Sequence, residues 1–431
     1  MVIIDQALKK RQAERNPIRV GMIGAGYMGR GIASQILKSV PGMELAGIYS
    51  RNISDALRAY NNAGITSNIK EVRTAREVDD AIKRGQYVVT NDMSVICAAD
   101  GIDAIIEVTG TIEFGAQVAL QAIEHGKHII LMNAELDATL GPILKIYADR
   151  AGVIYTTSDG DQPGVILNLF RWVKSIGMRP VLAGNMKGLQ DPYRTPETQK
   201  EYAAKYKQKA PMVTSFADGT KISMEMAVVA NATGLKAGRR GMYGPRCNHV
   251  NEVIELFPKE QMLNGGLVDY ILGAEPAAGV FVIGYSEDPL QQEYMYYYKM
   301  GDGPFYVFYN PCHLCHLETP LTVARAVIFG DAAGAPAGGP ICDVIAVAKQ
   351  QLKAGDLLDG MGGFSCYGML ENSDVSRAQN LLPIGLSEGC KLVRDVGKDG
   401  FISYEDIELP ENRLCDKLRE MQNDHFSISQ G

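Results

Sequence analysis

The sequence has no uninterrupted apolar run of about 18 residues, the length a membrane-spanning helix needs. We therefore expect no membrane partner. The opening segment, MVIIDQALKKRQAERNPIRV, contains only a short apolar stretch that charged residues follow at once, which is not the pattern of a secretory signal peptide. No internal repeat is visible either, so repeat architectures are excluded. These absences predict a globular protein of the cytoplasm.

An excess of basic charge is also missing. The chain has 43 Lys and Arg residues and 50 Asp and Glu residues, which gives a net charge of −7. Because nucleic-acid binding needs a basic face, we expect no nucleic-acid partner. The 8 cysteines are scattered along the chain, and without a secretion signal we expect them to be reduced thiols. The length of 431 residues predicts two or three domains.

Apolar, β-branched runs alternate with helical spacing over residues 17–160. The expected strands cover 18–24, 44–50, 104–110 and 128–133, and a helix is expected between the last two. Strand and helix in alternation predict an α/β fold, a doubly wound parallel sheet of the Rossmann type. Residues 64–100 have the composition of a more polar excursion, with one helix near residues 78–83.

The pattern changes after residue 160. In PMVTSFADGTKISMEMAVVANATG, the runs TSF and KISMEMAVVA predict two strands joined by a hairpin at Asp218-Gly219. Residues 161–330 are therefore expected to form an α+β domain for substrate, catalysis and dimerisation. The small, Gly- and Pro-rich stretch Gly330–Pro340 predicts a linker. Residues 341–431 would then form a third, small β-rich domain.

A dinucleotide fingerprint follows the first expected strand. Gly24, Gly26 and Gly29 fit G-x-G-x-x-G, with Tyr27 and Met28 between the last two. In this motif the first glycine permits a tight turn, the second admits the pyrophosphate and the third allows close packing of helix on strand. The alternative is a glycine-rich turn that binds no ligand.

The end of the second strand distinguishes the two nicotinamide cofactors. NAD sites place Asp or Glu there, whereas this chain has Ser50 and Arg51. A guanidinium binds phosphate, so the pair predicts NADP(H). Four further residues lie at expected strand ends on the cofactor side: Thr109, Gly110, Asn133 and Asp161.

Segments in both halves resemble a known group of enzymes. GMIGAGYMG, IIEVTG and HIILMNAELDATLGPIL resemble the cofactor domain of homoserine-dehydrogenase-like oxidoreductases. DGDQPG, AGNMKG, EMAVVANATGL, YGPR, GVFVIG, GDGPFYVFYNPCHL and LETPLTVARAV resemble a branch of that group similar in activity to 1-deoxy-D-xylulose 5-phosphate reductoisomerase, with a C-terminal SAF-type domain. The resemblance covers nearly the whole chain.

The resemblance implies a step of isoprenoid biosynthesis, in which a phosphorylated ketose rearranges to an aldehyde that NADPH then reduces. Such chemistry needs a donor for two neighbouring oxygens, a proton carrier and a basic residue for phosphate. The candidates for these roles are Lys187, Glu225, Asn231, His313 and Glu318, with Arg246 as the phosphate ligand. Lys187 would polarise the substrate from a glycine-flanked loop, and Glu225 would move protons from the strand KISMEMAVVA.

Each candidate has a plainer alternative. Lys187 could be a solvated surface lysine, Glu225 could lie on a wet strand face and Arg246 could form a structural ion pair. The chain also departs from the resemblance: Ala134 and Glu135 follow Asn133 where homoserine dehydrogenases have lysine, and Asn185 and Met186 precede Lys187 where related enzymes have a second lysine. The substrate is therefore open.

Two segments imitate metal sites. Cys312-His313-Leu314-Cys315-His316 concentrates zinc ligands but has no second Cys/His pair nearby. Asp395–Asp406 resembles a calcium loop, yet Gly397 stands at its third position and Asp406 at its twelfth, where Glu is expected. A divalent metal is thus allowed but not indicated.

The sequence predicts an NADPH-dependent oxidoreductase with a small-molecule substrate, present as a homo-oligomer. One alternative is a dehydrogenase of a hydroxy acid or sugar acid that performs no rearrangement. Another is a non-catalytic, NADP-dependent sensor.

Overall fold

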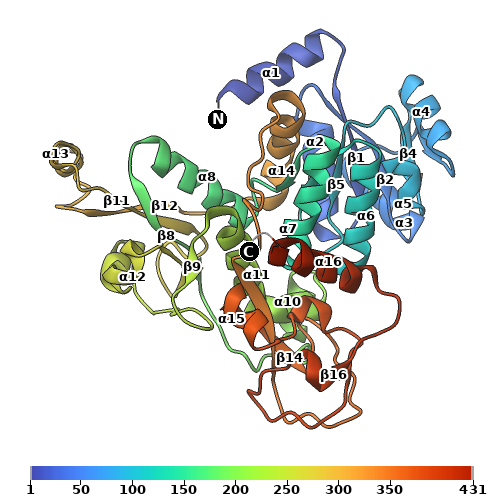
Figure 1. The fold of residues 1–431 in the computed structure, drawn as a ribbon. Coiled ribbons are helices and arrows are strands. Elements are labelled where there is room, and N and C mark those ends of the chain that lie inside the picture. The colour runs from blue at the N-terminus through green and yellow to red at the C-terminus, as the bar shows by residue number, and fades with distance from the viewer. Residues whose placement is uncertain (1, 429–431) are drawn as a thin grey trace. The chain divides into compact units, whose positions relative to one another are not determined.

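The computed structural model describes residues 2–428 (Figure 1). The chain forms two compact units, each assembled from segments distant in sequence. The first unit contains the described residues of Met1–Asp161, Leu314–Ala335 and Lys417–Gly431, and the second contains Gln162–His313 and Pro336–Asp416. This division differs from the three predicted domains, because the chain passes from one unit to the other more than once.

A seven-stranded parallel sheet organises the first unit, in the order β3-β4-β2-β1-β5-β6-β7. Its strands are β1 (Ile18–Ile23), β2 (Met43–Tyr49), β3 (Ile69–Glu71), β4 (Tyr87–Thr90), β5 (Ala104–Glu107), β6 (His128–Leu131) and β7 (Tyr155–Thr157). The predicted α/β Rossmann sheet is confirmed. Over residues 64–100 the helix expected near 78–83 is confirmed as part of Ala75–Lys83, but β3 and β4 were not predicted, because strands of three and four residues are too short for a pattern to show. The order reverses between β1 and β5, which marks the topological switch point.

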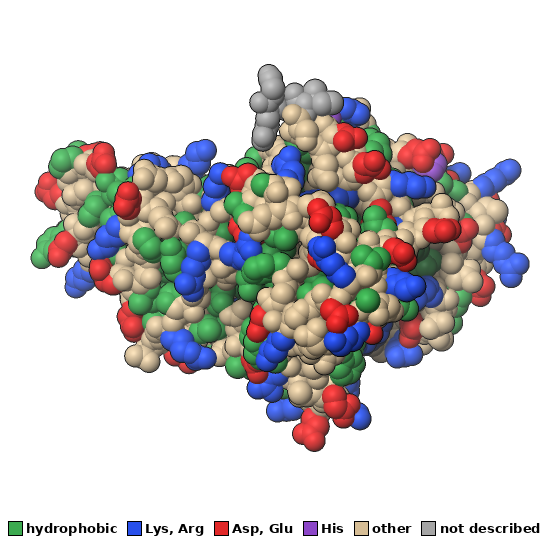
Figure 2. All heavy atoms as spheres, turned by 60° about the horizontal axis from the view of Figure 1, so that its bottom comes forward, with side chains coloured by type: hydrophobic (Ala, Val, Ile, Leu, Met, Phe, Trp, Pro, Cys, Tyr) green, Lys and Arg blue, Asp and Glu red, His purple; other side chains and the backbone are tan. Residues whose placement is uncertain are grey.

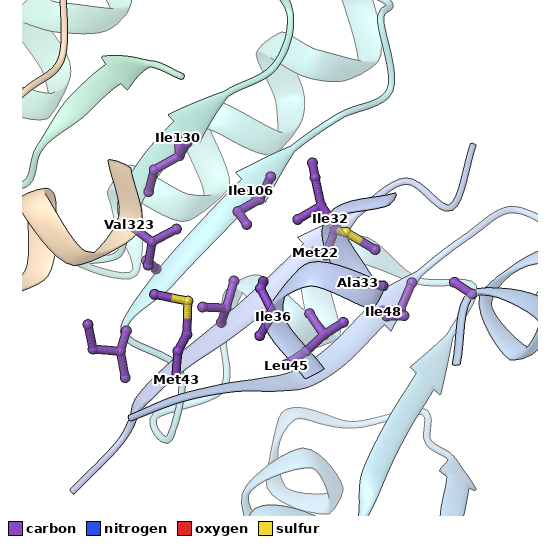
Figure 3. Close-up of a cluster of buried hydrophobic side chains, with 14 of the residues drawn as sticks. Met22, Ile32, Ala33, Ile36, Met43, Leu45, Ile48, Ile106, Ile130 and Val323 are labelled. Atoms are coloured by element: carbon purple, nitrogen blue, oxygen red, sulfur yellow. The ribbon is translucent and has the colours of Figure 1, made fainter. Parts of the chain in front are cut away.

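Helices cover this sheet in two groups. One contains α2 (Tyr27–Ser39), α3 (Ile53–Asn62) and α14 (Cys315–Ala324), and the other contains α4 (Ala75–Lys83), α5 (Met93–Cys97), α6 (Ile112–Glu124) and α7 (Ala134–Ala151). Helix α1 (Val2–Ala13) contacts α14. Figure 3 shows the core beneath the first group, where Ile32 and Ile36 of α2 meet Met22 of β1, and Val323 of α14 joins them.

Polar contacts, as well as this core, attach helix α14 to the Rossmann unit. The Ser158 hydroxyl is 2.9 Å from that of Thr319, and the Asp159 amide donates to Thr322 Oγ1 at 2.8 Å. Arg325, the first residue of the π-helical turn η2 (Arg325–Phe329), forms a buried ion pair with Asp159 and a partly exposed one with Asp331. These bonds attach the helix to the loop that follows β7.

The C-terminal helix α16 (Leu414–Ile428) supplies hydrogen-bond partners where the backbone bonding of α7 is interrupted. Pro142 lies inside α7 and disturbs the backbone ladder there. The Ile143 amide donates to Gln422 Oε1 at 3.2 Å, and the Thr139 carbonyl accepts from Arg419 at 3.2 Å. A segment near the end of the chain is therefore needed to satisfy the backbone of the Rossmann unit.

A mixed five-stranded sheet, β12-β11-β8-β10-β9, organises the second unit. Its strands are β8 (Arg179–Lys187), β9 (Lys236–Ala237), β10 (Leu267–Leu272), β11 (Val280–Tyr285) and β12 (Phe305–Asn310). Strand β10 runs parallel to β8, whereas β11 runs antiparallel to it. The helices of this unit are α8 (Gln162–Ser175), α9 (Lys200–Lys205), α10 (Ala210–Ala217), α11 (Thr220–Thr233), α12 (Lys259–Leu263), α13 (Pro289–Tyr297), α15 (Ser373–Ala378) and the 3-10 turn η1 (Val250–Glu255).

The predicted hairpin at Asp218-Gly219 is wrong. The segments expected as strands form α10 and α11, and Gly219, with φ +92°, is the N-cap residue of α11. Helix α11 contacts β8 and β10 on one side and the ribbon of β13 (Cys342–Ala348) and β14 (Cys366–Asn372) on the other. Because the helix is buried nearly all round, its sequence has no polar stripe from which a helical period could be recognised.

Residues 336–416 belong to the same unit as α11. Asn231 Oδ1 accepts the amides of Ile341 and Cys342 at 2.8 and 3.1 Å, and the buried Lys349 ammonium is 2.8 Å from the Asp218 carboxylate. The remaining elements are the 3-10 turns η3 (Ile384–Leu386) and η4 (Tyr404–Asp406) and the two-stranded pair β15 (Lys391–Leu392) and β16 (Ile407–Glu408). Buried hydrogen bonds and an ion pair thus attach this segment to α10 and α11.

The surface is mixed in charge. Acidic and basic side chains are interspersed over the face drawn in Figure 2. No helix among residues 2–428 has the length and apolar character required to cross a membrane.

A buried acid on α7 makes the stability of the Rossmann unit depend on pH. The Tyr155 hydroxyl donates to Asp137 Oδ1 at 2.9 Å, which joins α7 to β7. Burial raises the pKa of Asp137 to about 7, and the Tyr155 hydrogen bond offsets only part of this. The folded state therefore binds this proton more tightly than the unfolded chain does, so stability falls as pH rises towards about 7.

Asp137→Asn should reduce this dependence on pH. The wild-type protein should lose thermal stability between pH 5 and pH 8, and the variant should lose less, because its side chain has no proton to release. Thermal unfolding followed by circular dichroism at both pH values measures the difference. Asp149→Asn, which removes an exposed carboxylate from the same helix, should behave like wild type. Equal pH dependence in wild type and Asp137→Asn would show that Asp137 does not titrate in this range.

Candidate functional site

The glycine loop after β1 has the geometry of a dinucleotide site. Gly24 adopts φ +121°, and a Cβ there would lie 3.0 Å from the Val108 carbonyl oxygen. A Cβ on Gly29 would overlap the Gly24 carbonyl, so this residue must be glycine for α2 to approach β1. Gly26, by contrast, faces open space, since no atom lies within 4 Å of its Cβ position. The space beside Gly26 can therefore accept the pyrophosphate of a ligand. The next two residues, Tyr27 and Met28, begin α2.

Ser50 and Arg51 directly follow β2, next to this loop. Ser50 is buried and its amide donates to the Thr90 carbonyl at 3.1 Å, whereas Arg51 is exposed. Within residues 2–428 the Arg51 guanidinium has no hydrogen bond or ion pair of its own. No carboxylate occupies the position that would accept a ribose 2′-hydroxyl. The chemistry of these residues suits a 2′-phosphate.

Thr109 and Asn133 meet at the ends of β5 and β6 through a residue that the sequence reasoning missed, and Gly110, with φ +68°, directly follows Thr109. Glu107, the last residue of β5, is fully buried and accepts hydrogen bonds from the Thr109 amide and from Asn133 Nδ2, both at 2.8 Å. Burial raises its pKa to about 7 despite these bonds. A lone carboxylate in the apolar run AIIEVTG was the available signal.

Asp161 and Glu318 lie on the α14 side of the Rossmann unit. Asp161 is buried, and Cys315 Sγ is 4.0 Å from its Oδ1. Glu318 is half-buried on α14, and burial together with the negative charge of Asp159 raises its pKa. A carboxyl group whose pKa is raised by burial releases its proton less readily than an exposed one, which suits a general acid.

The second unit gathers Lys187, Glu225, Gln162 and Asn185 at the end of β8. Lys187 Nζ lies 2.9 Å from Glu225 Oε2 and also donates to Gln162 Oε1. Asn185 Nδ2 donates to the same Glu225 oxygen at 2.7 Å, while its own Oδ1 is buried without a partner. The expected glycine-flanked loop is therefore wrong for Lys187, which is the last residue of β8. Glu225 extends to it from α11, a helix and not the expected strand.

Other predicted residues lie at the same edge of the five-stranded sheet. Leu272 pairs with Lys187 across β10 and β8, and Arg246 forms a bridge with Leu272, so the backbone of Arg246 is two strands from that of Lys187. His313 lies beyond the end of β12, and its Nδ1 is 3.0 Å from the Ala278 carbonyl. A carbonyl only accepts, so Nδ1 carries the proton and Nε2 of the neutral ring is an acceptor.

Asn231 does not join this group. It lies on α11 with Glu225, but its Oδ1 and backbone carbonyl hold Ile341, Cys342 and Ala337. These contacts give it a structural role in attaching the returning chain. Among residues 2–428, no three His, Cys, Asp or Glu side chains come together as a metal site requires.

Comparisons with known proteins match two separate segments of the chain. Residues 18–131 match the family model described as the oxidoreductase family, NAD-binding Rossmann fold. Residues 160–319 match the model described as oxidoreductase DRL, catalytic domain. Each match covers less than half of the chain, and the two do not overlap.

Two homoserine dehydrogenases are similar over a shorter stretch. The Pseudomonas aeruginosa protein is 26% identical over 138 residues, 32% of this chain and 28% of its own. The Methylobacillus glycogenes protein is 29% identical over 124 residues, 29% of this chain and 26% of its own. This chain thus matches only about a quarter of the length of these relatives. The solved myo-inositol dehydrogenase of Lactobacillus casei has a TM-score of 0.35 and 14% identity, with 63% of this chain and 72% of that one covered.

The pair Lys187 and Glu225 should show strong coupling in stability. Lys187→Met should lower the free energy of unfolding by about 3 kcal/mol or more, because it leaves a buried carboxylate without a cation. Glu225→Leu alone should also destabilise, whereas the double variant should recover most of the loss. Thermal and denaturant unfolding of the four proteins measure this. If the two losses simply add, the ion pair does not hold the two elements together.

Proposed function

We propose that this protein is an NADP(H)-dependent oxidoreductase of a small phosphorylated or polyhydroxylated keto compound. The observation that carries the proposal is the Lys187–Glu225 pair at the carboxyl end of β8, within the segment that matches an oxidoreductase catalytic domain. A lysine held at the end of a strand by a buried carboxylate is placed to bind a substrate oxygen. The glycine loop and Arg51 support NADP(H) as the cofactor.

Lys187 is the group that would polarise the substrate. An ammonium has three N–H donors, and Gln162 and Glu225 take two of them, which leaves one for a carbonyl or hydroxyl oxygen. The Glu225 carboxylate, 2.9 Å away, holds the ammonium in its partly buried place. Asn185 and Gln162 orient the pair and so limit the positions that Nζ can take.

Arg246 and His313 would hold the rest of the substrate. The Arg246 backbone lies two strands from that of Lys187, about 10 Å at the usual strand spacing, which suits an anionic group at the far end of a short carbon chain. The free Nε2 of His313 accepts a hydrogen bond from a substrate hydroxyl. When bound to the Rossmann unit, NADPH would supply the hydride, and Glu318 is the candidate proton carrier of that unit.

The finer proposal is a reductoisomerase of the 1-deoxy-D-xylulose 5-phosphate type, in which a ketose rearranges before reduction. It rests on the resemblance of the catalytic segment. The competing function within enzymes is a simple dehydrogenase of a hydroxy acid or sugar acid. Incubation of 13C-labelled 1-deoxy-D-xylulose 5-phosphate with NADPH, followed by NMR of the product, distinguishes the two: a migrated carbon supports the reductoisomerase, and reduction without migration contradicts it.

Cofactor choice should depend on Arg51. NADP(H) should bind at least about tenfold more tightly than NAD(H), because a guanidinium and no carboxylate follow β2. Arg51→Ala should weaken NADP(H) binding and leave NAD(H) binding nearly unchanged, as measured by the fluorescence of the reduced cofactors. Arg58→Ala, an exposed arginine of α3 paired locally with Asp55, is the matched control. Equal affinities in the wild-type protein would contradict the NADP assignment.

Turnover should depend on Lys187. Lys187→Ala should lower kcat by roughly 100-fold or more, the effect of losing one preorganised electrostatic donor. Cofactor affinity should change little, because Lys187 lies in the other unit. Thermal unfolding must show that the variant is folded at the assay temperature, and Lys174→Ala, at the exposed end of α8, serves as control. A folded variant with normal turnover would remove Lys187 from the catalytic residues.

A sensor without catalysis is the alternative from another class. It would bind NADP(H), and Lys187→Ala would then change neither ligand binding nor any product. Incubation with NADPH and a panel of sugar phosphates, followed at 340 nm, tests it: oxidation of NADPH that Lys187→Ala abolishes contradicts the sensor.

A further inference from the structure

Glu107 occupies an unusual environment for a carboxylate. It is fully buried, and within residues 2–428 it has no ion-pair partner. Its oxygens accept instead from neutral groups: the Thr109 amide at 2.8 Å, the Thr109 hydroxyl and Asn133 Nδ2 at 2.8 Å. Burying a carboxylate without a cation is costly, and these hydrogen bonds offset part of that cost.

The groups that Glu107 organises are two loops. Thr109 Oγ1 lies 3.1 Å from the Thr111 hydroxyl, and Asn133 Nδ2 also donates to the Thr111 carbonyl at 2.9 Å. Asn133 Oδ1 in turn accepts the Leu136 amide at 3.1 Å and so caps α7. One carboxylate therefore fixes the segment after β5 and the N-terminus of the helix after β6.

These loops lie on one particular side of the switch point. The sheet order places β5 and β6 on one side of β1, and β2, with Ser50 and Arg51 at its end, on the other. In a Rossmann fold the adenosine ribose lies at the end of β2, and the dinucleotide crosses the switch point. The Glu107 loops therefore border the nicotinamide half.

We propose that Glu107 is a positioning residue for the nicotinamide half of the cofactor, acting through Thr109, Thr111 and Asn133. The inference rests on the proposed function, since it requires a nicotinamide dinucleotide on the Rossmann unit. Gly115 supports it: a Cβ there would lie 3.0 Å from Asn133 Nδ2, so α6 leaves room for this contact only because it has glycine at that position. Glu107 itself is too deeply buried to touch the ligand.

The first test separates the two halves of the cofactor. Glu107→Gln turns an amide donor towards Asn133 Nδ2, so the loops should lose one of their bonds. The Kd for NADPH, from cofactor fluorescence, should rise about tenfold, while the Kd for 2′,5′-ADP, from calorimetry, should stay unchanged. Arg51→Ala should weaken both ligands, and Glu124→Gln, an exposed carboxylate of α6, should weaken neither.

The second test exchanges the partners. Asn133→Asp alone places two carboxylates face to face and should weaken NADPH binding more than Glu107→Gln does. The double variant Glu107→Gln/Asn133→Asp restores an amide opposite a carboxylate, with Leu136 still capped, and should bind NADPH more tightly than either single variant. Gly115→Ala disturbs the same contact without changing charge, and should weaken NADPH but not 2′,5′-ADP.

Three results would overturn the inference. They are an unchanged NADPH affinity in Glu107→Gln, a parallel loss of 2′,5′-ADP affinity in Glu107→Gln or Gly115→Ala, and a double variant no better than its weaker parent. If Glu107→Gln fails to fold, Gly115→Ala decides alone. Failure of the proposed function is distinguishable, because the wild-type protein would then bind neither NADPH nor 2′,5′-ADP.

Discussion

A carboxylate on a helix that is buried on nearly all sides must find its hydrogen-bond and charge partners inside the protein. Glu225 is that carboxylate in the second unit, and its partners come from β8, which supplies Lys187 and Asn185. Lys187 in turn contacts Gln162 at the start of α8. The end of a strand and the start of a helix are thereby brought together around one lysine–glutamate pair.

The Rossmann unit uses a related device without a cation. Glu107, the last residue of β5, accepts hydrogen bonds from the neutral donors Thr109 and Asn133. These donors belong to the loops that border one side of the switch point. The two carboxylates differ in their electrostatics. Glu225 is compensated by an ammonium, whereas burial leaves Glu107 with a pKa of about 7. The first arrangement holds an ammonium at the end of β8, and the second fixes the segment after β5 and the start of α7.

The segments that complete each unit come from far along the chain. Helix α14 and the C-terminal α16 belong to the Rossmann unit, although the whole of β8 to β12 precedes them. Their attachment depends on specific polar contacts, such as Ser158 with Thr319 and Ile143 with Gln422. Helix α16 supplies hydrogen-bond partners to the backbone of α7 next to Pro142. A change in α16 should therefore also disturb α7.

The glycine loop, the strands beside it and the Rossmann sheet could be predicted from the sequence because their signals are local. Backbone strain requires glycine at Gly24, and β1, β2, β5 and β6 lie in largely apolar runs, whereas the short strands β3, β4 and β7 do not show such a signal. Lys187, Glu225 and Arg246 were also identified as candidates, from a resemblance. Their places were not: Glu225 lies on a helix, because burial on all sides removes the period that distinguishes helix from strand. Asn231 has partners more than 100 residues away, and Glu107 was missed because its donors come from two different loops. Such pairings depend on long-range packing, which only the tertiary structure decides.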